Sequence, residues 1–95
     1  MGEIDDLRGR IDAIDARLVL LLNERSSCAL AIGRLKRAAG LAVYQPLREV
    51  EVLDHVQREN AGPLDDAAVR RLFERIIDEA RRLERLAVHE TPETL

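Results

Sequence analysis

The stretch that decides the fold is residues 4–35, IDDLRGRIDAIDARLVLLLNERSSCALAIGRL, whose apolar side chains recur every seven residues. One register of the repeat holds Ile4, Ile11, Leu18 and Ile32, and the other holds Leu7, Ile14, Leu21, Cys28 and Leu35. Arg25 alone interrupts the pattern. Because no proline precedes Pro46 and Gly40 suits a helix end, the pattern predicts one helix over residues 3–39.

The length of this predicted helix indicates a second copy of the chain. At 1.5 Å per residue the helix would be roughly 50 Å long, whereas a compact chain of 95 residues has a radius of gyration of about 12 to 13 Å. The rest of the chain is too short to cover its apolar stripe from end to end. We therefore expect the same helix of a partner to cover it through a two-fold axis, which gives an obligate homodimer.

The remainder of the chain predicts two shorter helices and no strand. Pro46 suits the first turn of one helix, and Asp65 or Asp66 caps the other. In order, we expect a loop over 40–45, a helix over 46–59, a loop over 60–64, a helix over 65–88 and a frayed tail over 89–95. The prediction is a single all-α domain over residues 1–95, with three helices per chain in an intertwined homodimeric bundle.

Composition argues against several classes of protein. The formal net charge is −3 and the only aromatic residues are Tyr44 and Phe73, which does not suit nucleic-acid binding. Cys28 is the only cysteine, as suits a reducing cytoplasm. No apolar run approaches the ~20 residues of a membrane span, and the sequence opens with nothing like a signal peptide. We expect a cytoplasmic protein without membrane or nucleic-acid partners.

Arg25 and Lys36 are the strongest candidates for a binding site. A guanidinium in an apolar seam is destabilising unless an anion meets it, and that anion is either an internal carboxylate such as Glu24 or a ligand. Lys36 lies about three turns further along the same side, which leaves room for a compact dianion, although alone it also suits a solvated surface. Arg8 is roughly 25 Å from Arg25 along the helix, so it can reach that ligand only from the partner chain.

Further candidates lie on the shorter helices. Arg48 and Glu49 are in the first turn after Pro46, where an acid is stabilised by the helix dipole, although separately each suits the surface. Glu84 shares a helical stripe with Ile77 at the edge of apolar packing, and the alternative for it is an ion pair with a neighbouring Arg. No metal-ligand spacing, glycine-rich phosphate loop or nucleophile motif occurs. A cationic pocket without metal or cofactor favours a unimolecular reaction of a dianion held in a reactive shape.

With these residues identified, the sequence resembles the all-helical chorismate mutases. The resemblance spans nearly all of residues 4–86, in the stretches LRGRIDAIDARLVLLLNER, AIGRLK, VYQPLREVEVL, ENAGPLDDAAVRRLFERII and RRLER. It implies a cofactor-free isomerase that converts chorismate to prephenate in aromatic amino-acid biosynthesis. It also implies a dimer with two equivalent pockets, each completed by the other subunit.

The resemblance further implies roles for the candidate residues. Arg25 and the partner subunit's Arg8 would clamp the substrate carboxylates, and Lys36 would donate to the ether oxygen of the breaking bond. Arg48 would support the carboxylate network. Glu49 would accept a hydrogen bond from the ring hydroxyl.

Glu84, Gln45 and Ala80 depart from the commonest pattern of the family. Glu84 stands where many members have Gln, the second donor to the ether oxygen, so it would have to hold a proton in order to donate. Gln45 stands where many members have Asp near the ring hydroxyl, and Ala80 where some have a hydroxyl side chain. Gln45 leaves open an amino group in place of that hydroxyl, although the retained Glu49 favours chorismate.

Other functions stay open on the sequence. The 4-amino-4-deoxychorismate mutases and the isochorismate pyruvate lyases share the fold and differ in substrate. A non-catalytic helical dimerisation or regulatory module would also explain the long apolar stripe, but it would not need Arg8, Arg25 and Lys36 together. The resemblance also allows association with another enzyme of the aromatic pathway.

Overall fold

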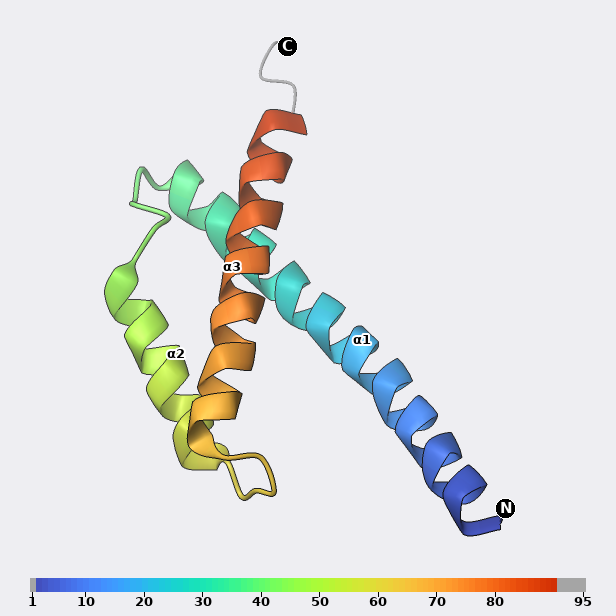
Figure 1. Ribbon diagram of the computed structural model, residues 1–95. Coiled ribbons are helices and arrows are strands. Elements are labelled where there is room, and N and C mark those ends of the chain that lie inside the picture. The colour runs from blue at the N-terminus through green and yellow to red at the C-terminus, as the bar shows by residue number, and fades with distance from the viewer. Residues whose placement is uncertain (1, 91–95) are drawn as a thin grey trace.

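A computed structural model describes residues 2–90, with side chains described through residue 88. These residues form three helices and no strand: α1 (Gly2–Ala38), α2 (Pro46–Glu59) and α3 (Asp66–Glu90). α2 and α3 run antiparallel as a hairpin, and α3 crosses the C-terminal half of α1 (Figure 1). The predicted all-α class, with one long helix and two shorter ones, is confirmed.

The turn between α1 and α2 follows from its residues. Gly40 has φ +71°, in the left-handed region that glycine adopts without a Cβ penalty, and this ends α1 at Ala38. The Leu41 N–H donates to the carbonyl of Lys36 at 2.8 Å, which satisfies one of the last carbonyl groups of the helix. Pro46 is the first residue of α2. An N–H group at this position would have no partner within the helix, so its absence in proline costs no hydrogen bond.

The start of α3 resolves a choice that the sequence leaves open. The carboxylate of Asp65 accepts a hydrogen bond from the Ala68 N–H at 2.7 Å, so Asp65 rather than Asp66 caps this helix. At the other end, α3 continues to Glu90, two residues beyond the predicted end at 88. The rest of the predicted tail, 91–95, lies outside the described residues.

The apolar core within one chain is small. Among the described side chains, only Leu53 of α2 and Val69 of α3 are buried and hydrophobic. The one buried residue of α1 is Gly33. A Cβ built on Gly33 would stand 3.8 Å from the Cδ atom of Glu84, at ordinary van der Waals distance, so α3 packs against α1 at this point.

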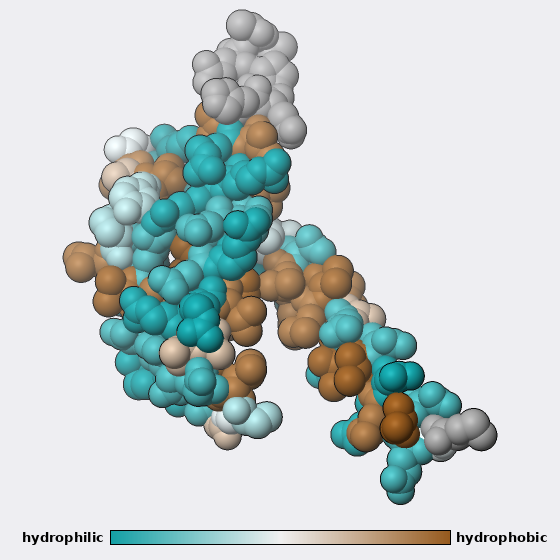
Figure 2. All heavy atoms as spheres, in the orientation of Figure 1, coloured by the Kyte–Doolittle hydropathy of each residue, from teal (hydrophilic) through white to brown (hydrophobic). Residues whose placement is uncertain are grey.

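The N-terminal half of α1 extends beyond the other two helices as an arm (Figure 1). The chain measures 60 × 30 × 15 Å, and its radius of gyration, 17.2 Å, exceeds the about 12 to 13 Å of a compact chain of this length. Hydrophobic side chains lie along the arm (Figure 2). On the arm, the exposed fractions of the side chains of the seven-residue repeat range from 48% at Ile14 to 59% at Ile4. Monomeric proteins rarely expose a continuous apolar face of this length.

Candidate functional site

The three helices and the loop before α2 surround a cavity of about 710 Å³, a volume within the usual range for small-molecule pockets. α1 forms one wall, α3 the facing wall, and the loop with the first turns of α2 one end. Seven of the eight predicted site residues line it: Arg25, Lys36, Gln45, Arg48, Glu49, Ala80 and Glu84. The fold therefore brings together residues that are far apart in the sequence.

The lining of the cavity is strongly basic, although the chain as a whole has a formal charge of −3. Its basic residues are Arg25, Lys36, Arg37, Arg48, Arg81 and Arg85, and its acidic residues are Glu49 and Glu84. Positive charges that converge on one cavity raise the local concentration of anions. The lining therefore suits a small molecule with more than one negative charge.

α1 supplies two cations without acidic partners. Arg25 is partly exposed, and no carboxylate among the side chains of residues 2–88 lies within ion-pair distance of it. The internal salt bridge that we considered for Arg25, with Glu24 as one partner, is therefore absent from this part of the chain. Lys36 donates from Nζ to Oε1 of Gln45 at 2.9 Å, a neutral acceptor that leaves the ammonium charge uncompensated. Both cations can meet an anion in the cavity.

Glu84 faces the same cavity from α3. Its side chain is half-buried against Gly33 of α1, where the nearest atoms to a built Cβ include its Cδ and Oε2 atoms at 3.8 and 3.9 Å. The ion pairs within the described side chains do not include Glu84, so the predicted alternative of a pair with a neighbouring Arg is not found there. Ala80, one turn earlier, lines the same wall.

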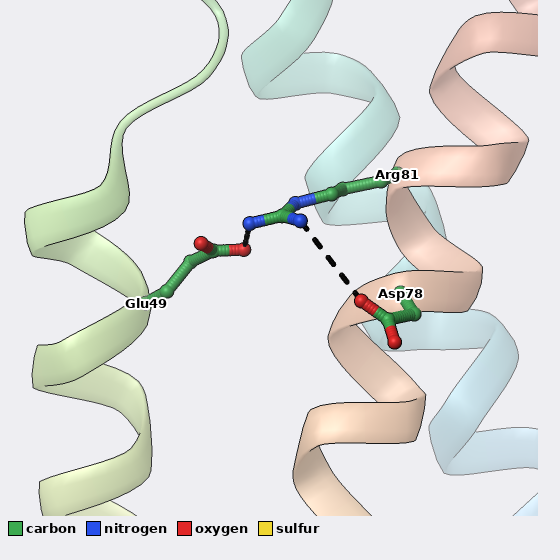
Figure 3. A network of polar contacts seen from close by, with 3 residues as sticks. All are labelled: Glu49, Asp78 and Arg81. Carbon is green, nitrogen blue, oxygen red and sulfur yellow. Dashed lines mark hydrogen bonds and ion pairs between the residues drawn. The ribbon is translucent and has the colours of Figure 1, made fainter.

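A polar network holds the loop end of the cavity together (Figure 3). The guanidinium of Arg81, on α3, forms an ion pair with the carboxylate of Glu49 on α2, and it lies 3.9 Å from the Asp78 carboxylate. The same guanidinium stands over the ring of Tyr44, 4.7 Å from the centroid, in cation–π geometry. Arg81 thus connects α3 to both the loop and the start of α2.

Arg81 is also a lining residue of the cavity that the sequence analysis missed, as are Arg37, Arg85 and Tyr44. Arg81 lies four residues after Ile77 and three before Glu84, so it shares their face of the helix. That spacing is the signal that could have identified it. Its pairing with Glu49 had no sequence signal, because the two residues belong to different helices.

Arg8 is the one predicted site residue outside the cavity. It lies on the exposed arm of α1, seventeen residues before Arg25, which corresponds to roughly 25 Å of helix.

Within the described residues, no group of three or more His, Cys, Asp or Glu side chains could hold a metal ion. None of the helices in this part of the chain is both long and apolar enough to cross a bilayer.

Together the crossed helices and the basic cavity define a small all-α protein with a pocket suited to a multivalent anion. Residues 7–85 match the family described as chorismate mutase type II, and the chain belongs to this family. The resemblance drawn from the sequence is thereby confirmed.

Two relatives and one solved structure illustrate the match. The chain is 49% identical over 86 residues to the bifunctional chorismate mutase/prephenate dehydratase of Neisseria gonorrhoeae, covering 86% of this chain and 23% of that protein. It is 38% identical over 82 residues to the 4-amino-4-deoxychorismate mutase of Streptomyces pristinaespiralis, covering 85% and 64%. The crystal structure of chorismate mutase from Helicobacter pylori in complex with prephenate superposes with a TM-score of 0.84 and 27% identity, covering 94% and 97%.

The bifunctional relatives are much longer than the matched region. This chain spans 23% to 25% of the length of those from Neisseria gonorrhoeae and Stutzerimonas stutzeri. The match therefore covers about a quarter of each of these relatives and not their full length.

Proposed function

We propose that this chain converts chorismate to prephenate by a cofactor-free Claisen rearrangement, as a step of aromatic amino-acid biosynthesis. The observation that carries the proposal is the cavity lined by six basic and two acidic side chains, with Arg25 and Lys36 free of acidic partners among the described residues. Chorismate is a compact dianion, so its charge matches this lining. The family and the prephenate-bound structural relative support the same reaction.

The reaction needs positioning and charge stabilisation rather than a nucleophile or a metal. One carbon–oxygen bond breaks and one carbon–carbon bond forms within the same molecule, while negative charge grows on the ether oxygen. Held in its folded shape by its carboxylates, the substrate loses conformational freedom before the chemical step. Donors aimed at the ether oxygen then stabilise the charge as it develops.

Each predicted site residue has a part in this mechanism. Arg25 and the partner subunit's Arg8 clamp the two carboxylates, and Arg48 supports that network. Lys36 donates to the ether oxygen from one side and Glu84, holding its proton, from the other. The remaining predicted site residues, Gln45, Glu49 and Ala80, lie around the ring, with Glu49 accepting from the ring hydroxyl.

The active form in this proposal is an intertwined homodimer. The apolar stripe of α1 is half-exposed along the arm, and a second α1 running antiparallel would bury it. The same arrangement carries Arg8 to the partner's cavity, which it cannot reach in its own chain. The site is therefore incomplete without the second subunit.

A second substrate is favoured by one residue of the site. Gln45 is a neutral side chain beside the proposed position of the ring hydroxyl, and the relative from Streptomyces pristinaespiralis is named for 4-amino-4-deoxychorismate. Isochorismate, the substrate of related pyruvate lyases, is a third candidate.

We also expect a cytoplasmic location, in line with the lone Cys28. Coupling to another aromatic-pathway enzyme accords with the bifunctional relatives.

The proposal is tested by following the three substrates side by side with purified protein. Loss of chorismate absorbance with formation of prephenate is the expected result, and Arg25→Ala and Lys36→Ala should abolish it. If the protein transformed none of the three and bound no dianion, the non-catalytic dimerisation module would be the better account. If it transformed only the amino compound, the substrate assignment would change within the same fold.

A further inference from the structure

Arg81 makes three of the contacts at the loop end of the cavity. It pairs with Glu49 from the start of α2 and lies 3.9 Å from Asp78 on its own helix (Figure 3). It also stands over the ring of Tyr44. Its side chain is 36% exposed and that of Glu49 only 23%, so solvent screens their attraction incompletely. The pair therefore lies in the cavity wall, partly shielded from solvent.

The same end of the cavity is held from the opposite side by α1. Lys36 donates to Gln45, which directly follows Tyr44 in the chain. Two cations, Lys36 and Arg81, therefore each bind an acceptor at this end, Gln45 and Glu49 respectively. Neither acceptor presents uncompensated negative charge: the amide of Gln45 is neutral, and the charge of Glu49 is offset by Arg81.

We infer that Arg81 is a positioning residue that selects the substituent of the substrate ring, favouring a neutral hydroxyl over an ammonium group. The inference rests on the proposed function, in which Glu49 accepts from that substituent. Glu49 can accept a hydrogen bond from a hydroxyl while it remains paired with Arg81, because a carboxylate has several acceptor positions. An ammonium group at the same place gains little, because its repulsion from Arg81 offsets its attraction to Glu49.

The distinction matters because the two candidate substrates differ at this substituent. An aliphatic amino group on a ring carbon is largely protonated near neutral pH, as α-amino groups are, whereas a hydroxyl is neutral. Gln45 alone would fit either group. Arg81 removes that ambiguity, since specificity is a difference of affinities and repulsion of one ligand contributes as much as attraction of the other.

The test is the ratio of kcat/KM for chorismate to that for 4-amino-4-deoxychorismate in charge-altered variants. The amino compound is also measured as a competitive inhibitor, so every variant gives a value even without turnover. Arg81→Met leaves Glu49 uncompensated, and the preference for chorismate should fall about fivefold to tenfold, a size consistent with a charged pair that is partly exposed. Arg81→Lys keeps the charge and should keep most of the preference.

A double-variant cycle separates a charge effect from a structural one. Glu49→Gln leaves Arg81 unpaired and should increase the preference for the hydroxyl compound. Glu49→Gln combined with Arg81→Met removes both charges and should return the preference toward the wild-type value, although both substrates react more slowly. A merely structural role for Arg81 would lower activity on both substrates together and would show no such return.

Arg75→Met is the matched control. Arg75 lies on the same helix and pairs with Glu79 at 2.6 Å, but neither residue lines the cavity. This variant loses one charge and one ion pair and should leave the substrate preference unchanged. Circular dichroism and thermal unfolding establish that each variant is folded.

Two outcomes overturn the inference while leaving the proposed function intact. In the first, wild-type protein converts chorismate but Arg81→Met has the wild-type preference. In the second, the double variant keeps the preference of Arg81→Met. If wild-type protein converts neither compound and binds neither, the proposed function itself fails.

Discussion

Glu84 of α3 lies directly against Gly33 of α1, at the place where the two walls of the cavity meet. A Cβ added to Gly33 would stand 3.8 Å from the Glu84 Cδ atom and 3.3 Å from Nη1 of Arg37. The first contact is ordinary van der Waals packing, and the second meets the mobile end of a long side chain. The position therefore has room for a methyl group and for little more.

Gly33→Ala should be tolerated and should raise stability. Alanine favours a helix interior over glycine by about 0.8 to 1 kcal/mol, and the Arg37 guanidinium can move by a few tenths of an ångström. Gly33→Leu should instead push α3 away from α1 and strongly reduce turnover. Chemical denaturation and the chorismate assay measure both effects. Gly9→Ala, with open space around its Cβ, is the control for helix propensity alone.

Substitution of Glu84 should test its role as a donor to the ether oxygen. A carboxylate cannot donate a hydrogen bond, so the proposed role requires the protonated form, whereas an amide donates in its ordinary form. Glu84→Gln should therefore raise kcat/KM for chorismate, and Glu84→Ala, which removes the group, should lower it. Equal kcat/KM values for the two variants would exclude Glu84 as a donor.

Arg25 should lower stability while it supports activity. It is the one position that breaks the apolar repeat, and no acid among the described side chains compensates it. Arg25→Leu restores the repeat and should raise the free energy of unfolding by about 1 kcal/mol or more. The same variant should lose about two to three orders of magnitude in kcat/KM, as expected for removal of a charged group that binds the transition state. A variant that was both less stable and fully active would contradict this assignment.

Mixed dimers should test whether Arg8 acts across the subunit interface. Arg8→Ala and Arg25→Ala homodimers should each be nearly inactive. After unfolding and refolding as an equal mixture, half of the dimers carry one of each chain, and each of these has one intact site. Activity should recover to about one quarter of the wild-type value, a fraction set by the two-fold symmetry. If the mixture stayed inactive, Arg8 and Arg25 would not meet in a shared site.

Much of the fold follows from local pattern. The repeat over residues 4–35 predicts the long helix, and Gly40 and Pro46 mark the turn because each has a backbone preference that acts over a few residues. The sequence leaves the N-cap of α3 open between Asp65 and Asp66, since an aspartate suits an N-cap at either position. The structure selects Asp65 because its carboxylate reaches the Ala68 N–H. The extent of α3 was predicted two residues short.

By itself, the sequence determined the helices, the exposed apolar stripe and the cation in the seam, Arg25. These are one-dimensional properties: spacing along one helix decides which side chains share a face. Only the tertiary structure decided that Arg81 pairs with Glu49 and that Glu84 lies against Gly33. Those contacts depend on the rotation and crossing of separate helices. Small differences in packing between distant residues determine this arrangement, and no local periodicity reveals it.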